Sequence, residues 1–227
     1  MLKLYGHDTS PYVRRIRVLL VELGLPFVRD SRSWTVADAD VLTLNPCLRV
    51  PALEAPRSDG ERQLLLDSRI IAAFLYEQPG RALATWPGDH PPPAPTLFQS
   101  RTRWDDENAL SILDAAQDSL INLFVLELDG ITPAQSPYLT RQLARAESCL
   151  RWLDSRLGSD DTFHPGRFGD LDLALACSLD WMLFRERYPV RQLRNLARAL
   201  DRHAERPSLQ QTHPRLAQNT ALPKAEK

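Results

Sequence analysis

The sequence contains little cysteine, little net charge and no long hydrophobic run. Its three cysteines among 227 residues, Cys47, Cys149 and Cys177, are too few and too scattered for a disulfide framework or a zinc site. The five histidines show no spacing typical of metal ligands, so we expect no metal. The net charge of -1 does not favour nucleic acid or an anionic membrane as a partner.

Two further absences concern membranes and export. No apolar run approaches the ~18 residues needed to span a bilayer, and the N-terminus shows no signal-peptide pattern. The 43% hydrophobic content is ordinary for a globular chain. We therefore expect a cytoplasmic protein that makes no use of a membrane, in a compartment that keeps thiols reduced.

Prolines divide the chain. Six of the 18 prolines lie between residues 79 and 95, which indicates a stiff linker. Residues 1–78 alternate short apolar runs with helical periodicity in the order βαβ, then ββα, which predicts an α+β domain with a four-stranded mixed sheet. Helical periodicity recurs in the segments 96–127, 137–157, 170–186 and 190–204, which predicts an all-α domain over residues 96–210. Residues 211–227 form a polar tail.

The first strand and helix give the first candidate site. Residues 2–5 predict a strand, and Ser10 and Pro11 occupy the N-cap and first position of a helix that ends near Gly24. A hydroxyl at the positive end of a helix is a place to hold an anion. The simpler alternative is that Ser10 only caps the helix. We expect the following arginines, Arg14, Arg15 and Arg17, to lie on a solvated face.

A second candidate site follows further along. A short helix is expected near residues 36–44, and Pro51 stands at the start of a strand, where proline is tolerated. Residues 55–60 predict a hairpin loop between strands. Asp67 and Ser68 then offer a second N-cap, opening an apolar helix.

Three motifs together carry a family resemblance. Thr9-Ser10-Pro11-Tyr12 resembles the Cys-Pro-Tyr-Cys motif of glutaredoxins with both cysteines gone. With Asn45-Pro46-x-x-x-Val50-Pro51-x-Leu53 and Asp67-Ser68-x-Ile70-Ile71, it resembles the thioredoxin-like domain of cytosolic glutathione transferases, most nearly small bacterial members of serine type. Phe168-Gly169-Asp170-Leu171-Asp172 resembles the start of the family's buried helix, with Gly169 where Ser or Thr is usual. Gly supplies no side-chain acceptor, but Asp172 can still accept a backbone bond.

The resemblance implies a fold and an activity. The fold would be a thioredoxin-like N-terminal domain followed by a helical C-terminal domain. The protein would be a transferase that conjugates glutathione, its co-substrate, to a small electrophile, with no further cofactor, and it would form a homodimer. The alternative of another class is a family-like binding or interaction module without catalysis. Reduction of disulfides is disfavoured because position 10 carries serine in place of cysteine.

The resemblance also implies roles for particular residues. Ser10 would donate a hydrogen bond to the glutathione thiolate. The remaining ligand contacts would come from Arg49 at the glycyl carboxylate, Val50 with a cis Pro51 at the cysteinyl backbone, and Asp67 and Ser68 at the γ-glutamyl end. A possible electrophile pocket would include Tyr12, Trp104 and Asn108.

Two residues offer alternatives near the thiol. Tyr5 ends the first strand and is a rival thiol contact, although packing is its simpler role. Cys47 lies near the proline loop and lacks an obvious activating cation, so it is a weak candidate for a nucleophile.

Overall fold

The computed structural model describes residues 1–31, 45–57, 59–77, 103–157, 159 and 161–217. The chain forms two compact units, one of Met1–Thr96 with Gln210–Lys227 and one of Leu97–Leu209. The C-terminal segment from Gln210 thus belongs to the first unit. The helix expected near residues 36–44 and the linker expected at 79–95 lie outside the described residues.

The first unit is built on a mixed sheet of four strands. They are β1 (Leu2–Tyr5), β2 (Phe27–Asp30), β3 (Ala52–Pro56) and β4 (Arg62–Leu66). Their order is β2-β1-β3-β4. β1 runs parallel to β2 and antiparallel to β3, and β3 and β4 form an antiparallel hairpin. This is the mixed sheet that the sequence predicts.

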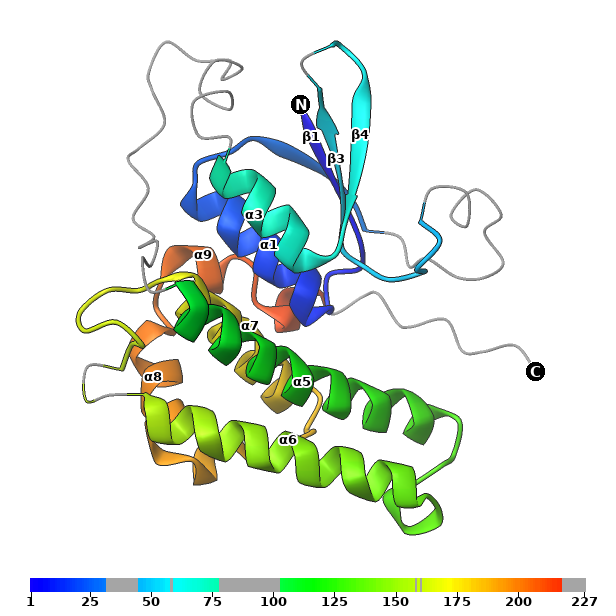
Figure 1. Ribbon diagram of the computed structural model, residues 1–227, viewed down its shortest axis with the longest axis vertical. Helices are drawn as coiled ribbons and strands as arrows, with labels where there is room; N and C mark the ends of the chain where they lie inside the picture. The colour runs from blue at the N-terminus through cyan, green and yellow to red at the C-terminus, as the bar shows by residue number, and fades with distance from the viewer. Residues whose placement is uncertain (32–44, 58, 78–102, 158, 160, 218–227) are drawn as a thin grey trace. The chain divides into compact units, whose positions relative to one another are not determined.

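Two helices pack side by side against this sheet (Figure 1). They are α1 (Pro11–Glu22) and α3 (Ser68–Glu77). In each helix, apolar residues recur at helical spacing and form a stripe that is buried. The fully buried apolar side chains of this core include Val13, Ile16, Leu19, Leu20, Leu53 and Ile71.

The arginines of α1 correct a sequence prediction. Arg14 and Arg15 are 1% and 2% exposed, so the solvated face expected for this run is wrong. Arg14 Nε donates a hydrogen bond to Thr212 Oγ1 at 3.3 Å, and Thr212 belongs to the C-terminal segment. Arg17 forms an ion pair with Asp8. α1 is therefore covered on more sides than its apolar stripe indicates.

The second unit is helical. Its long helices are α5 (Arg103–Leu128), α6 (Pro137–Arg156), α7 (Asp170–Phe184) and α8 (Arg194–His203), with the short turns η1 (Pro133–Gln135) and η2 (Val190–Gln192). A short helix, α9 (Pro207–Gln210), lies at the end of this unit, and the turn η3 (Pro214–Ala217) follows in the C-terminal segment of the first unit. α5 and α6 form an antiparallel hairpin, beside which α7 packs (Figure 1). The fully buried apolar residues of this core include Leu113, Leu120, Leu150, Leu153 and Leu179.

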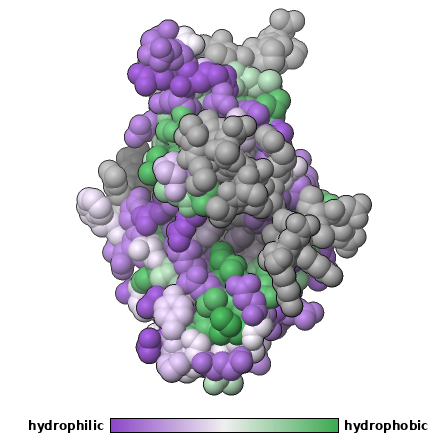
Figure 2. Space-filling model, turned by 90° about the vertical axis from the view of Figure 1, so that its right-hand side faces the viewer, coloured by the Kyte–Doolittle hydropathy of each residue, from purple (hydrophilic) through white to green (hydrophobic). Residues whose placement is uncertain are grey.

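α5 contains a long, mostly apolar stretch. Its stretch Trp104–Leu128 is long and apolar enough to cross a membrane by length and composition alone, with 39% of the most apolar window buried. The core helix of a soluble protein passes the same test. Part of the apolar character of α5 lies on the surface, where Val125 and Leu128 are exposed. Figure 2 shows apolar side chains among polar ones on one face of the molecule. Acidic residues such as Asp114 and Asp118 interrupt this stretch, so the sequence shows no long uninterrupted apolar run here.

α7 begins at a buried carboxylate. Gly169 is the N-cap residue, and its N–H donates to Asp172 Oδ2 at 2.8 Å, while the Phe163 N–H donates to Asp172 Oδ1 at 3.0 Å. The backbone bond expected for Asp172 is thus confirmed. Burial raises the pKa of Asp172 to about 6, because the loss of solvent outweighs these two hydrogen bonds, which favour the charged form.

The raised pKa of Asp172 gives a signed prediction. Between the unfolded and folded pKa values the folded protein binds more protons, so ionisation of Asp172 lowers the free energy of unfolding as the pH rises. Asp172→Asn removes this titration. Relative to the variant, the wild type should lose about 2 kcal/mol between about pH 4.5 and 7 in urea unfolding. A difference that does not change with pH would contradict the burial-dominated pKa.

Candidate functional site

Three predicted site segments meet at one end of the sheet. Tyr5, the last residue of β1, pairs with Ala52, the first residue of β3. Ala52 pairs in turn with Leu66, the last residue of β4. The segments that follow Tyr5, precede Ala52 and follow Leu66 therefore leave the same edge of the sheet. These segments carry Ser10, Pro51 and Asp67.

The contact at Gly6 shows how closely two of these segments approach. Gly6 has φ +132°, and a Cβ at this position would lie 2.4 Å from Val13 Cγ2 and 2.9 Å from Val50 Cβ. Heavy atoms do not approach so closely without displacement. Only glycine therefore lets the turn after β1 lie against both α1 and the residue before Pro51.

Ser10 is fixed at the start of α1 as the sequence predicts. Its Oγ accepts a hydrogen bond from the Val13 N–H at 3.3 Å, and its own N–H donates to the His7 carbonyl at 3.2 Å. The side chain is 5% exposed. The hydroxyl thus caps the helix, and its hydrogen atom is not used by that bond, because the oxygen acts as the acceptor.

The loop before β3 is shaped by Asn45. Its Nδ2 donates to the Arg49 carbonyl at 2.6 Å, and its Oδ1 accepts the Cys47 N–H at 3.0 Å. The Val50–Pro51 peptide is cis, which confirms the conformation expected from the resemblance. Cys47 and Arg49 are exposed, so Arg49 is accessible to a ligand and Cys47 is not shielded from solvent.

Asp67 and Ser68 open α3. Asp67 Oδ1 accepts the Arg69 N–H at 2.8 Å, and Asp67 adopts the left-handed region with φ 76°. A residue with a Cβ is uncommon in this region and tends to mark a site that the surroundings over-determine. Asp67 is exposed, whereas Ser68 is 4% exposed. Asp67 can therefore reach a ligand with the carboxylate oxygen that does not cap the helix.

The Tyr5 hydroxyl is engaged within the sheet. It donates to Glu54 Oε2 at 2.7 Å, and Glu54 also forms an ion pair with Arg62. Tyr5 is 8% exposed. This arrangement favours a packing role for Tyr5 over a contact with a thiol.

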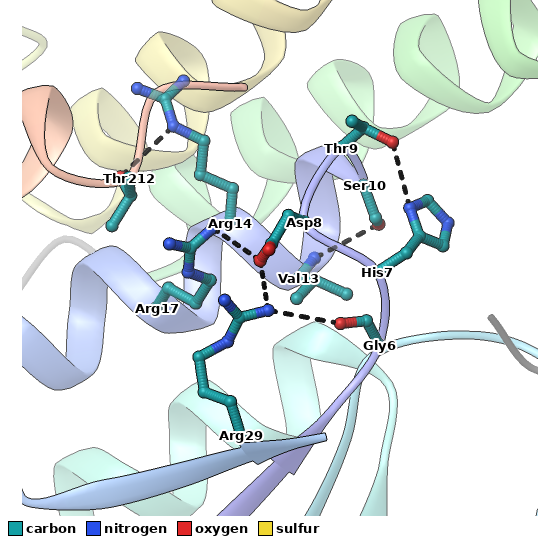
Figure 3. A network of polar contacts seen from close by, with 10 residues as sticks. All are labelled: Gly6, His7, Asp8, Thr9, Ser10, Val13, Arg14, Arg17, Arg29 and Thr212. Carbon is teal, nitrogen blue, oxygen red and sulfur yellow. Dashed lines mark hydrogen bonds and ion pairs between the residues drawn. The ribbon is translucent and has the colours of Figure 1, made fainter. Parts of the chain in front are cut away.

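An ion-pair network that sequence reasoning missed holds the loop between β1 and α1 (Figure 3). The Asp8 carboxylate pairs with Arg17 of α1 at 3.0 Å and with Arg29 of β2. Arg29 Nη2 also donates to the Gly6 carbonyl at 3.4 Å. The sequence gives one sign of this ion-pair network, the run of arginines in an otherwise apolar helix. That run does not identify Asp8 or Arg29 as members of the network.

The residues predicted for an electrophile pocket lie on two different units. Tyr12 is half-buried near the start of α1 in the first unit. Trp104 and Asn108 lie near the start of α5 in the second unit, and both are exposed, Trp104 to 78%. A shared pocket for these three residues stays a prediction.

Comparisons with known proteins agree with this arrangement. The family model of the glutathione S-transferase N-terminal domain matches residues 9–78, and that of the C-terminal domain matches residues 136–217. The chain is 30% identical over 190 residues to the uncharacterized GST-like protein YibF of Escherichia coli K12, covering 83% of this chain and 85% of that protein. The chain therefore belongs to the glutathione S-transferase family.

Further relatives cover nearly the whole chain. Glutathione S-transferase GstB of Escherichia coli K12 is 26% identical over 215 residues, 92% of this chain and 96% of that protein. A glutathione S-transferase from Methylobacillus flagellatus, solved with glutathione bound, is 27% identical with a TM-score of 0.72, covering 94% of this chain and all of that chain. The thioredoxin-like domain followed by a helical domain is thus confirmed.

The contact at Gly6 predicts a loss of stability. Gly6→Ala should lower the free energy of unfolding by at least about 2 kcal/mol, because it adds both backbone strain and a clash with Val13 and Val50. The matched control is Gly60→Ala, which also has positive φ but nothing within 4 Å of the added Cβ. It should cost only about 1 kcal/mol. Equal losses in urea unfolding would contradict the close approach.

Proposed function

We propose that the protein is a glutathione S-transferase that binds glutathione at the shared end of β1, β3 and β4, stabilises its thiolate and conjugates it to a small electrophile. The observation that carries this proposal is the Ser10 hydroxyl at the start of α1, on the loop that contacts Val50 before cis-Pro51. The glutathione bound in the Methylobacillus flagellatus relative supports the choice of ligand.

The chemistry asked of Ser10 is within its reach. A free thiol with pKa about 8.5 is only ~3% thiolate at pH 7, and lowering the pKa by about two units takes ~2.7 kcal/mol. A hydrogen bond to a charged group supplies about 1.5–3 kcal/mol, and a helix N-terminus about 0.3–1 kcal/mol. Ser10 therefore acts as a donor, since these energies do not deprotonate serine itself.

The rest of the site would hold the ligand in place. The Val50 backbone would pair with the cysteinyl backbone of glutathione like an added strand. Asp67 would attract the ligand ammonium, and Ser68 would hold the adjacent carboxylate at the N-terminus of α3. Arg49 would reach the glycyl carboxylate. No cofactor beyond glutathione is needed for attack of the thiolate on an electrophile.

Two features of the proposal rest on the family alone. The electrophile would bind near Tyr12, Trp104 and Asn108, and the working form would be a homodimer.

A family-like binding module without catalysis would hold glutathione with the thiol pKa of the free tripeptide. The pKa of the bound thiol therefore separates the two functions.

Replacing Ser10 tests the thiolate contact. Ser10→Ala should raise the pKa of bound glutathione by roughly one to two units, because the lost hydrogen bond favours the thiolate. Affinity at about pH 6, where the thiol is protonated, should change little. The conjugation rate at pH 7 should fall about threefold to 25-fold, in proportion to the thiolate that is lost. Thiolate absorbance measures the thiol pKa, calorimetry measures the affinity, and formation of the conjugate measures the rate.

The cap that Ser10 provides needs a matched control. Ser136 begins α6 in the same way, followed by Pro137, and its Oγ accepts the Leu139 N–H at 3.4 Å. Ser136→Ala loses a similar cap, about 1 kcal/mol, and should leave the bound thiol pKa unchanged. An unchanged pKa in Ser10→Ala as well would mean that Ser10 only caps α1.

Replacing Asp67 tests the ammonium contact. Asn still caps a helix and tolerates positive φ, so Asp67→Asn should keep α3 intact while removing the charge. Affinity for glutathione should fall about tenfold to a hundredfold. A glutathione analogue that lacks the amino group should bind the variant and the wild type equally. Equal weakening for both ligands in calorimetry would reject Asp67 as the partner of the ammonium.

A further inference from the structure

The loop between β1 and α1 is fixed from outside by one carboxylate. Asp8 pairs with Arg17 in the second turn of α1 and with Arg29 of β2, the parallel neighbour of β1. Arg29 also donates to the Gly6 carbonyl at 3.4 Å. Figure 3 shows both arginines converging on Asp8. The network therefore ties the loop to the helix that follows it and to the neighbouring strand.

The network is partly shielded from solvent. The side chains of Asp8, Arg17 and Arg29 are 23%, 14% and 25% exposed. A lone exposed ion pair holds its partners weakly, but two guanidinium groups that share a shielded carboxylate restrict each other's geometry. Asp8 is thus better fixed than an ordinary surface carboxylate.

A short path leads from Asp8 to the Ser10 hydroxyl. The Ser10 N–H donates to the His7 carbonyl at 3.2 Å, which closes a turn with Asp8 and Thr9 at its centre. Within the turn, Thr9 Oγ1 lies 3.1 Å from His7 Nδ1. A displacement of the Asp8 backbone is therefore passed on to Ser10, two residues further along the same turn.

We propose that Asp8, held by Arg17 and Arg29, is a positioning residue that directs the Ser10 hydroxyl at the thiol of bound glutathione. This inference rests on the proposed function, because it assigns Asp8 a role in the thiolate contact. Asp8 acts through Ser10 and need not touch the ligand.

Charge and positioning predict opposite results when Asp8 is neutralised. Removal of a negative charge near the site, with two guanidinium groups left behind, favours the thiolate and lowers the thiol pKa. Loss of the fixed loop geometry weakens the Ser10 hydrogen bond and raises the thiol pKa. The direction of the change therefore identifies the role.

The experiment is a double-mutant cycle with Asp8→Asn and Ser10→Ala, read out by the absorbance of bound glutathione thiolate. Asp8→Asn should raise the thiol pKa by about half a unit to one unit and slow conjugation at pH 7 about 1.5-fold to threefold. Affinity at about pH 6 should stay unchanged. In the Ser10→Ala background, Asp8→Asn should have no further effect on the pKa.

Two more variants control for folding and charge. Asp59→Asn removes a carboxylate that accepts from Arg57 at 3.1 Å on the exposed β3–β4 loop, and it should change nothing at the site. Asp8→Glu keeps the charge but moves the carboxylate by one methylene. If Asp8 positions Ser10, the thiol pKa should rise in this variant, and if only the charge of Asp8 matters, the thiol pKa should not change. Asp8→Glu also serves if Asp8→Asn does not fold. The turn also contains His7, which can titrate. The thiolate absorbance follows ionisation of the glutathione thiol alone, so protonation of His7 is not mistaken for it.

The outcomes are distinct. A lowered or unchanged pKa in Asp8→Asn or Asp8→Glu overturns the positioning role while leaving the proposed function intact. An equal shift in both backgrounds also overturns it, because Asp8 would then act without Ser10. A Ser10→Ala variant with the wild-type pKa contradicts the proposed function, and the role of Asp8 fails with it.

Discussion

The pairing of Tyr5 with Ala52 is the constraint on which the rest of the site depends. This pair ends β1 and begins β3 at the same edge of the sheet, and Leu66 ends β4 in the same row. Loops that are distant in sequence therefore share one small volume. The space between them is so small that Gly6 cannot carry a Cβ. The candidate site is thus a consequence of strand order and register more than of any single residue.

How much the sequence could predict depends on the range of the interactions. Two bonds at helix starts were predictable, the one from the Val13 N–H to Ser10 and the one from the Gly169 N–H to Asp172, because each joins residues three positions apart. The burial of Arg14 was not, because its partner Thr212 lies 198 residues away. The hydrophobic stripe of α1 identifies the face that meets the sheet and gives no information about segments that cover the helix elsewhere.

The candidate site shows the same division. The prediction of a cis peptide before Pro51 depended on the motif, because most peptide bonds before proline are trans. The Val50–Pro51 peptide is cis in the structure. The role of Asp8 depends on Arg29 of β2, a pairing that the order of the strands creates and local pattern does not. At Asp67 the capping bond to the Arg69 N–H is local and was predictable, whereas the left-handed backbone between β4 and α3 has no signal in the sequence.

We propose that glutathione binds at the end of the sheet where Ser10, Val50 and Asp67 lie, with its sulfur at Ser10. A crystal structure of the protein with glutathione bound tests this most directly. We expect the ligand sulfur within hydrogen-bonding distance of Ser10 Oγ, about 3.5 Å or less, and the ligand ammonium beside Asp67. A ligand bound at this edge with its sulfur turned away from Ser10, or bound elsewhere on the protein, would contradict the account.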